Sequence, residues 1–424
     1  MMKTKIKKLE GTARELEIRL SPEKVKEAYS EIMVEIKRDS ALPGFRKGKA
    51  PDDIIEKKFK EDALAELKKR LVPEAYQEAL LEHKMSPVSF PEIWDVEIDK
   101  EGNLNFKVKV DLHPEVKIDK MKGIKVTSER SEVTDTEVSE ALEGVRGMYA
   151  EYVDVKRAVV KGDFAVCAME AFVEGKAITK KREETWIQAD KAESMLSLGE
   201  ELVGLSEGDK KTIEVVLPEN YPDKSYSGKK AVFEVEVKKI KEKKLPELND
   251  ELAAKMGKEK IDDLRHEVRM QLIQRKEDNN RTKMKNQIIA HLLKKTDFEL
   301  PGTMVNRQIE FLLKKATDDL KQKGVGQKEI DANKDALLEK LKPEARNKIK
   351  LYFILDGIAA AENIEVSDNE VEESLKQLAA YYNQSYESVR RYYEDNDLIG
   401  GMKEQIREDK TLDLLLDGAT IVTK

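Results

Sequence analysis

The chain is organised around residues 44–51, whose sequence is Gly-Phe-Arg-Lys-Gly-Lys-Ala-Pro. Glycine permits the backbone angles of a tight loop, and proline favours the start of a following helix. One aromatic ring and three cations therefore stand in a loop bounded by helix breakers, with no helical or strand face behind the ring. Taken alone, such a stretch is most often a solvated turn. Its surroundings favour another interpretation, a loop that contacts a partner carrying negative charge and an apolar pocket.

The flanking sequence predicts an α+β module over residues 1–111 with this loop at the junction of two helices. Ser21 fits an N-cap, and Pro22 then occupies the first helical position. Pro51 opens the second helix in the same way. The predicted elements, read from apolar spacing, are a strand pair within 5–20, a helix to about residue 40, a helix from 51 to about 71, and strands at 93–98 and 104–110.

Charge is distributed unevenly along the chain. The 424 residues carry a formal net charge of -7, yet residues 1–51 hold 13 Lys and Arg against 8 Asp and Glu, a local balance of +5. The rest of the chain therefore carries -12. This asymmetry predicts an N-terminal module that faces an anionic partner and an acidic body that does not itself bind nucleic acid, including DNA.

The remaining sequence predicts a multidomain protein, since its character changes twice. Residues 112–150 read as a connector with a helix capped near Thr134 or Asp135. Residues 151–244 are rich in strands and glycines, and residues 245–424 read as helical to the end of the chain. The long amphipathic runs fall at about 260–295, 302–322, 335–361, 368–381 and 399–416.

Catalytic and cofactor signatures are missing from the sequence. The four histidines lie far apart in the chain, so we expect no metal site. The spacing from Gly44 to Gly48 is one residue too short for a phosphate-binding loop, and no Ser or Thr follows Lys49. We expect no cofactor and no ATP-driven or covalent chemistry.

Cellular context follows from the cysteine count and the apolar runs. The single cysteine, Cys167, stands in an apolar segment and is predicted to be a buried structural thiol. One cysteine makes no internal disulfide, which suits a reducing cytoplasm. The basic N-terminus lacks the apolar run of a signal peptide, and no stretch reaches the length of a membrane span.

Residues 381–393 contain five of the twelve tyrosines. Helical spacing would place Tyr382, Tyr386, Val389 and Tyr393 on one face, and such apolar stripes usually pack against a core. The alternative is a contact surface for varied polypeptides, because tyrosine binds apolar and polar groups at low entropic cost.

Together these features resemble bacterial trigger factor, a family of ribosome-associated chaperones, over essentially the whole chain. The resemblance implies a helical chaperone domain with arms after the middle segment. It also implies that the ring and cations of residues 44–51 touch protein and RNA beside the exit tunnel of the large ribosomal subunit. The ribosome-binding residues would be Gly44, Phe45, Arg46, Lys47 and Gly48.

The middle segment resembles an FKBP-type peptidyl-prolyl isomerase domain. Such pockets rotate the prolyl bond in an apolar, aromatic-lined cavity and need no nucleophile. Tyr221 and Phe233 match the family's aromatic positions, whereas Ala168 replaces an acidic residue. Aromatic residues are expected where this sequence has Met169, Ile178 and Leu198. We therefore expect weak or absent isomerase activity from a domain that still binds polypeptide.

The sequence thus predicts an ATP-independent chaperone that docks at the ribosomal exit and shelters nascent or unfolded polypeptides. Two alternatives stay open: an enzyme whose main task is prolyl isomerisation, and an assembly factor for folded ribosomal proteins. Client contacts would fall on Tyr382, Tyr386 and Tyr393.

Overall fold

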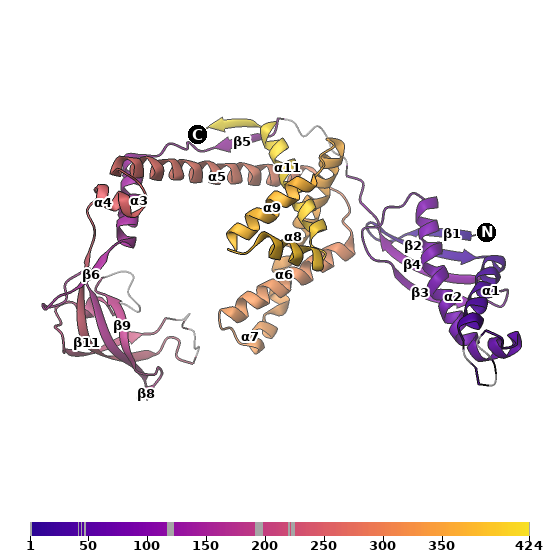
Figure 1. Cartoon of the computed structure of the whole chain (residues 1–424), viewed down its shortest axis with the longest axis horizontal. Coiled ribbons are helices and arrows are strands. Elements are labelled where there is room, and N and C mark those ends of the chain that lie inside the picture. Colours follow the sequence, from indigo (N-terminus) through magenta and orange to yellow (C-terminus); the bar gives the residue numbers. More distant parts are fainter. Residues whose placement is uncertain are drawn as a thin grey trace. The chain divides into compact units, whose positions relative to one another are not determined.

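The computed structural model shows two compact units, and Figure 1 traces the chain through both. The first unit contains residues 1–126, 285–318 and 328–420, and the second contains 127–284, 319–327 and 421–424. The residues that the structure describes are 2–40, 42–43, 45, 48–116, 123–190, 198–218, 221 and 225–423.

The N-terminal part of the first unit is a four-stranded antiparallel sheet, with two helices packed on one face (Figure 1). Alternate residues of the second strand, such as Leu16 and Ile18, are buried beneath the helices, while the residues between them face solvent. This period of two is what one covered sheet face requires. The strand order is β1-β2-β4-β3. The elements are β1 (Met2–Lys8), β2 (Ala13–Leu20), α1 (Pro22–Asp39), α2 (Asp52–Glu82), β3 (Glu92–Ile98) and β4 (Leu104–Asp111).

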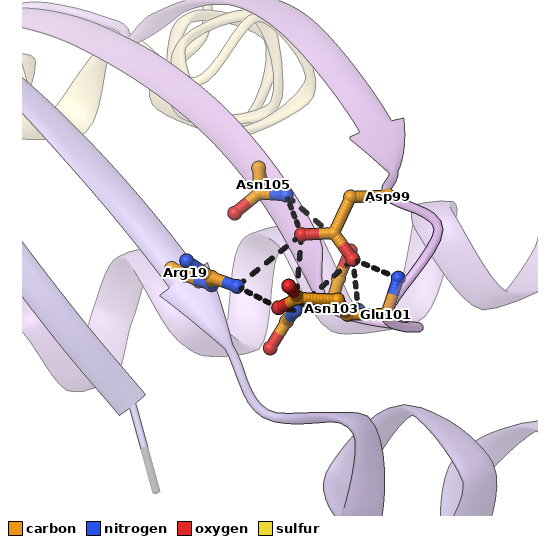
Figure 2. A network of polar contacts seen from close by, with 5 residues as sticks. All are labelled: Arg19, Asp99, Glu101, Asn103 and Asn105. Carbon is orange, nitrogen blue, oxygen red and sulfur yellow. Dashed lines mark hydrogen bonds and ion pairs between the residues drawn. The ribbon is translucent and has the colours of Figure 1, made fainter.

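A carboxylate organises the turn between β3 and β4. Asp99 accepts hydrogen bonds from the backbone N–H groups of Glu101 and Asn103, both at 2.9 Å, and from the side-chain amides of Asn103 and Asn105 (Figure 2). The Arg19 guanidinium lies 3.4 Å away on β2. The Asn103 N–H and these other donors lower the pKa of Asp99 to about 2, because they stabilise the charged form.

The rest of the first unit is helical, and the five long runs predicted from the sequence are confirmed to within one residue at each end. Its helices pack around residues such as Phe353 and Ile354, which are fully buried. The helices are α6 (Gly302–Gln322), α7 (Gln327–Ala332), α8 (Lys334–Ala361), α9 (Asp368–Tyr381), α10 (Tyr386–Asp395) and α11 (Ile399–Asp417), after the end of α5 (Ile261–Lys295).

Two predictions for the C-terminal region are wrong. The chain does not stay helical to its end, because β12 (Thr420–Thr423) follows α11 and pairs with β5 (Lys125–Ser128). The β-branched sequence Thr-Ile-Val-Thr favours a strand once a partner strand is available. Residues 381–393 are also not one helix, because Asn383 has a positive φ of 52° and Ser385 caps α10. A residue in this left-handed conformation ends a helix.

The second unit is built on a six-stranded antiparallel sheet in the order β10-β11-β7-β8, in which β6 also pairs with β11 and β9 with β7. One sheet face holds an apolar core that includes Cys167, Phe233 and Val237. The predicted burial of Cys167 is confirmed. The strands are β6 (Glu151–Asp154), β7 (Phe164–Val173), β8 (Lys176–Ala177), β9 (Arg182–Gln188), β10 (Lys210–Val216) and β11 (Lys230–Lys244).

Short helices precede and follow the strands of this sheet in the chain. Helix α3 (Asp135–Met148) begins at Thr134, whose side chain and that of Glu137 form a capping box, so Thr134 is the cap. Helix α4 (Asp250–Lys255) and the start of α5 pack against α3 through an apolar cluster. The members of that cluster are Val138, Leu142, Ala253, Leu264 and Val268.

Candidate functional site

The loop predicted to dock on the ribosome connects α1 and α2. Phe45 is 40% exposed, although it is a large apolar side chain, and its N–H donates to the Leu42 carbonyl at 3.0 Å. Lys49 is exposed beside it. Gly44, Arg46 and Lys47 lie outside the described residues. The described part of the loop therefore presents an aromatic ring and a cation at the helix–helix junction.

A small apolar cluster lies beneath this loop, apart from the main core of the module. Its buried members come from both ends of the loop and from α2, so they tie the loop's two ends together. They are Leu42, Ala50 and Ile55, and the partly buried Met33, Ile36 and Phe59 pack against them.

One backbone conformation and one ion pair also shape the ends of the loop. Gly48 has a φ of 76°, a conformation that glycine adopts without strain. A Cβ atom at this position would lie 3.7 Å from the Arg38 carbonyl oxygen, so the strain of any other residue would arise from the backbone angle rather than from a clash. Lys37 near the end of α1 forms a 2.5 Å ion pair with Asp52 at the start of α2. The sequence interpretation did not find this pair, because the two residues are 15 positions apart.

The five residues predicted to form the isomerase-like pocket lie in one apolar cluster of the second unit. Met169, Leu198 and Phe233 are buried, with exposures of 6%, 0% and 3%. Ile178 and Tyr221 are partly buried and pack against them. All five side chains thus belong to one apolar core, and Tyr221 and Phe233 are the two aromatic members among them.

Sequence reasoning missed members of this cluster. Tyr226 packs partly buried against it, and Leu202 is fully buried within it. No local signal marked Tyr226, since the serines on either side of it favour a turn. Burial also raises the pKa of the Cys167 thiol to about 12, which leaves it protonated and unreactive.

The predicted tyrosine surface divides into two groups. Tyr386 and Tyr393 pack partly buried around Val389, as a core interpretation of the stripe requires. Tyr382 follows the end of α9 and is 63% exposed, so it does not share their face. It makes an edge-to-face contact with Tyr381, with ring centroids 5.0 Å apart. The exposed tyrosines of this stretch are therefore Tyr381, Tyr382 and Tyr392, the last of which is 60% exposed on α10.

Within the described part of the chain, no three His, Cys, Asp or Glu side chains lie together in a way that could hold a metal ion. In the same residues, no helix has both the length and the apolar character needed to cross a bilayer.

Comparison with known families matches three models along this chain. The model described as "Bacterial trigger factor protein (TF)" matches residues 2–145, and the one described as "Bacterial trigger factor protein (TF) C-terminus" matches residues 260–417. Between them, residues 155–238 match the model described as "FKBP-type peptidyl-prolyl cis-trans isomerase". The order of the matches is the order expected from the resemblance.

Relatives and solved structures match over nearly the full length. A trigger factor of Geobacillus thermodenitrificans (strain NG80-2) is 32% identical, covering 99% of this chain and 100% of the relative. A trigger factor of Bacillus pumilus (strain SAFR-032) is 31% identical, covering 98% and 100%. A solved structure described as "Promiscuous Substrate Recognition in Folding and Assembly Activities of the Trigger Factor Chaperone" is 23% identical, with a TM-score of 0.55 over 98% of this chain and 99% of that chain. The last similarity bears on the fold, which is multidomain α+β with an FKBP-like part.

Proposed function

This chain belongs to the trigger factor family of ribosome-associated chaperones, and we propose that it docks beside the exit tunnel of the large ribosomal subunit to shelter nascent polypeptides. Docking uses Gly44, Phe45, Arg46, Lys47 and Gly48. The working parts are a docking domain at 1–111, a connector at 112–150, an FKBP-like domain at 151–244 and a chaperone domain at 245–424.

The observation that supports this proposal is the exposed ring of Phe45 on the loop between α1 and α2. The small apolar cluster around Ile55 holds the ends of that loop. Phe45 is a large apolar side chain, and the adjoining cluster around Ile55 leaves it exposed, so that a partner can reach it. Aromatic residues beside cations are the usual energetic centres of interfaces. Charged ribosomal RNA would add a salt-dependent attraction to the basic loop.

Sheltering clients requires many weak contacts rather than one tight pocket. Weak contacts at several sites bind an unfolded chain by avidity, and that avidity falls once the client buries its own apolar surface. No nucleotide is needed for release. On the helical body, exposed aromatic side chains such as Tyr381, Tyr382 and Tyr392 are available for such contacts, while Tyr386 and Tyr393 pack in the core.

Ribosome co-sedimentation tests the docking proposal. Changing Phe45, Arg46 and Lys47 to Ala should reduce the bound fraction by about tenfold or more, since an aromatic and two cations are lost from one interface. A matched control on the same module changes Lys26, Val34 and Lys60 to Ala, which removes two exposed cations and one exposed apolar side chain. If the docking variant and the control pelleted with ribosomes equally, docking through this loop would be excluded.

Prolyl isomerisation is the second candidate, because residues 155–238 match an FKBP-type isomerase. Met169 and Leu198 stand where aromatic walls are expected, and both are buried, so we propose weak activity. Proline-limited refolding of a model client measures it. Clear acceleration that is lost on changing Tyr221 to Ala would make isomerisation the main function instead.

A third role, assembly of folded ribosomal proteins, rests on charge. Ribosomal proteins are basic, and the chain beyond residue 51 carries a net -12. Affinity capture from a lysate, with ribosome-bound nascent chains separated from released folded proteins, distinguishes this role. We propose a cytoplasmic protein that is partly ribosome-associated, with no membrane, DNA or metal partner.

A further inference from the structure

Asp111, at the end of β4, is an ionisable residue with only 3% of its surface exposed. Its side chain accepts hydrogen bonds from the Thr12 hydroxyl at 3.5 Å, from the Thr303 backbone N–H at 2.8 Å and from the Thr303 hydroxyl at 2.5 Å. Thr12 precedes β2 in the docking module, and Thr303 is the second residue of α6 in the helical body. One buried carboxylate thus joins two parts of the first unit that are almost 200 residues apart in sequence.

Helix α6 lacks a cap of its own. Its first helical hydrogen bond runs from the Val305 N–H to the carbonyl of Pro301, so Pro301 takes the capping position. Proline has no side-chain oxygen, and the first turn of α6 contains no acidic residue. The open N–H groups of a first helical turn favour a negative acceptor. Asp111 supplies that acceptor from the neighbouring module.

Other contacts between the docking module and the helical body constrain the relative orientation of the two parts less strictly. Val88 packs with Phe353 and its neighbours in an apolar cluster, and apolar contact tolerates small rotations. The Lys8–Glu299 pair is 3.9 Å long, with both side chains more than 60% exposed, so it contributes little. The two bonds from Thr303 to Asp111 are short and directional, and their acceptor is buried. A buried carboxylate that loses its donors is costly.

We propose that Asp111 is a positioning residue that locks the docking module onto the helical body, so that docking on the ribosome also sets where the chaperone surface stands. The proposal rests on the docking function proposed above. Without the lock, the module still folds and still binds the ribosome, because Asp111 lies in the sheet and not in the α1–α2 loop. What is lost is the fixed direction in which the body extends from the docked module.

The test uses the full-length chain in three assays: ribosome co-sedimentation, suppression of aggregation of a free unfolded client, and cross-linking to a ribosome-tethered nascent chain. Asp111→Ala and Thr303→Val each remove part of the lock. Since hydrogen bonds to a charged group are lost, the equilibrium between locked and unlocked forms shifts about tenfold or more. Asp111→Asn keeps one acceptor oxygen at the same place, so it should keep part of the cross-linking that Asp111→Ala loses. Glu299→Ala, across the same junction but exposed, is the matched control.

The expected result is a split between assays. Both lock variants co-sediment and suppress free aggregation like the wild type, while their nascent-chain cross-linking falls and spin-label distances between module and body broaden. The double variant should be no worse than Asp111→Ala alone, because Asp111→Ala already removes the bond that Thr303→Val removes. Unchanged distances and cross-linking in folded Asp111→Ala and Thr303→Val would overturn the proposal. Loss of co-sedimentation in these variants would also contradict it, whereas the docking proposal fails only if the loop variant still pellets.

Discussion

Two phenylalanines in this chain have opposite roles. Phe45 is 40% exposed on the loop between α1 and α2, whereas Phe233 on β11 is 3% exposed within the FKBP-like core. The first lies on a loop between helix breakers, with a small cluster beneath the loop to hold its ends. The second lies on the buried face of a sheet, with Met169 and Leu198 in the same core cluster. An exposed ring is available to a partner, while a packed ring stabilises its own domain.

This contrast explains why one region is expected to bind strongly and the other to catalyse weakly. A pocket that rotates a prolyl bond needs apolar walls around an empty space. Here two of the corresponding side chains, Met169 and Leu198, are not aromatic and are buried in the core cluster. Substitutions that separate binding from stability therefore test the comparison directly.

The largest effect is expected from Phe233→Ala. Removing a fully packed ring should lower the free energy of unfolding of the FKBP-like domain by about 3–5 kcal/mol. Each region has its own tryptophan, Trp94 on β3 and Trp186 on β9, so fluorescence of Trp186 in a Trp94→Phe background reports on this domain in urea. Val232→Ala, on the opposite sheet face and partly exposed, is the control with a much smaller loss. Equal losses would mean that the ring is not packed as described.

A smaller effect, and on a different property, is expected from Phe45→Ala. Stability should change by less than about 0.5 kcal/mol, because the ring is already exposed. Ribosome affinity should fall by about tenfold, as for an aromatic at the centre of an interface. Fluorescence polarisation with labelled protein measures the ribosome affinity. The control is Val34→Ala, which removes another exposed apolar side chain of the module. A loss of stability comparable to that of Phe233→Ala would show that the two rings are not in different environments.

The smallest effect is expected on stability at low pH, through Asp99. The pKa of Asp99 is lowered from 3.8 to about 2 in the folded state, so its stabilising contribution is complete above 3.8 and is lost as the pH falls toward 2. Asp99→Asn should be slightly less stable than wild type near neutral pH and should lose less on acidification through this window. Thermal unfolding followed by Trp94, in a Trp186→Phe background, measures the difference. Parallel pH profiles for both proteins would exclude a role for this carboxylate.

Local signals in the sequence predicted most of the elements. Ser21 and Pro22 mark the start of α1, and the apolar period of α6 and α8 predicted their ends to within one residue. These signals are local, because caps and periodicity act within a few residues. The break at Asn383 was also local and could have been read from asparagine followed by a serine cap. It was missed because the apolar spacing of the tyrosines continues across it.

Features that depend on distant partners could not be predicted. Nothing near Thr420 indicates that it continues as a strand, because its partner β5 lies about 300 residues earlier. The same holds for Asp111, whose donors belong to Thr12 and Thr303. The pocket residues were named from a family pattern, and only the fold shows that Met169, Leu198 and Phe233 fill one space.

The pairing of β6 with the end of β11 has an evolutionary consequence. Residues 151–154 and 241–244 run antiparallel, so the chain enters and leaves the FKBP-like domain at adjacent points. A segment whose ends are neighbours can be gained, lost or exchanged without moving the sequences on either side. Substitutions in the FKBP-like part can therefore accumulate without displacing the sequences on either side of it.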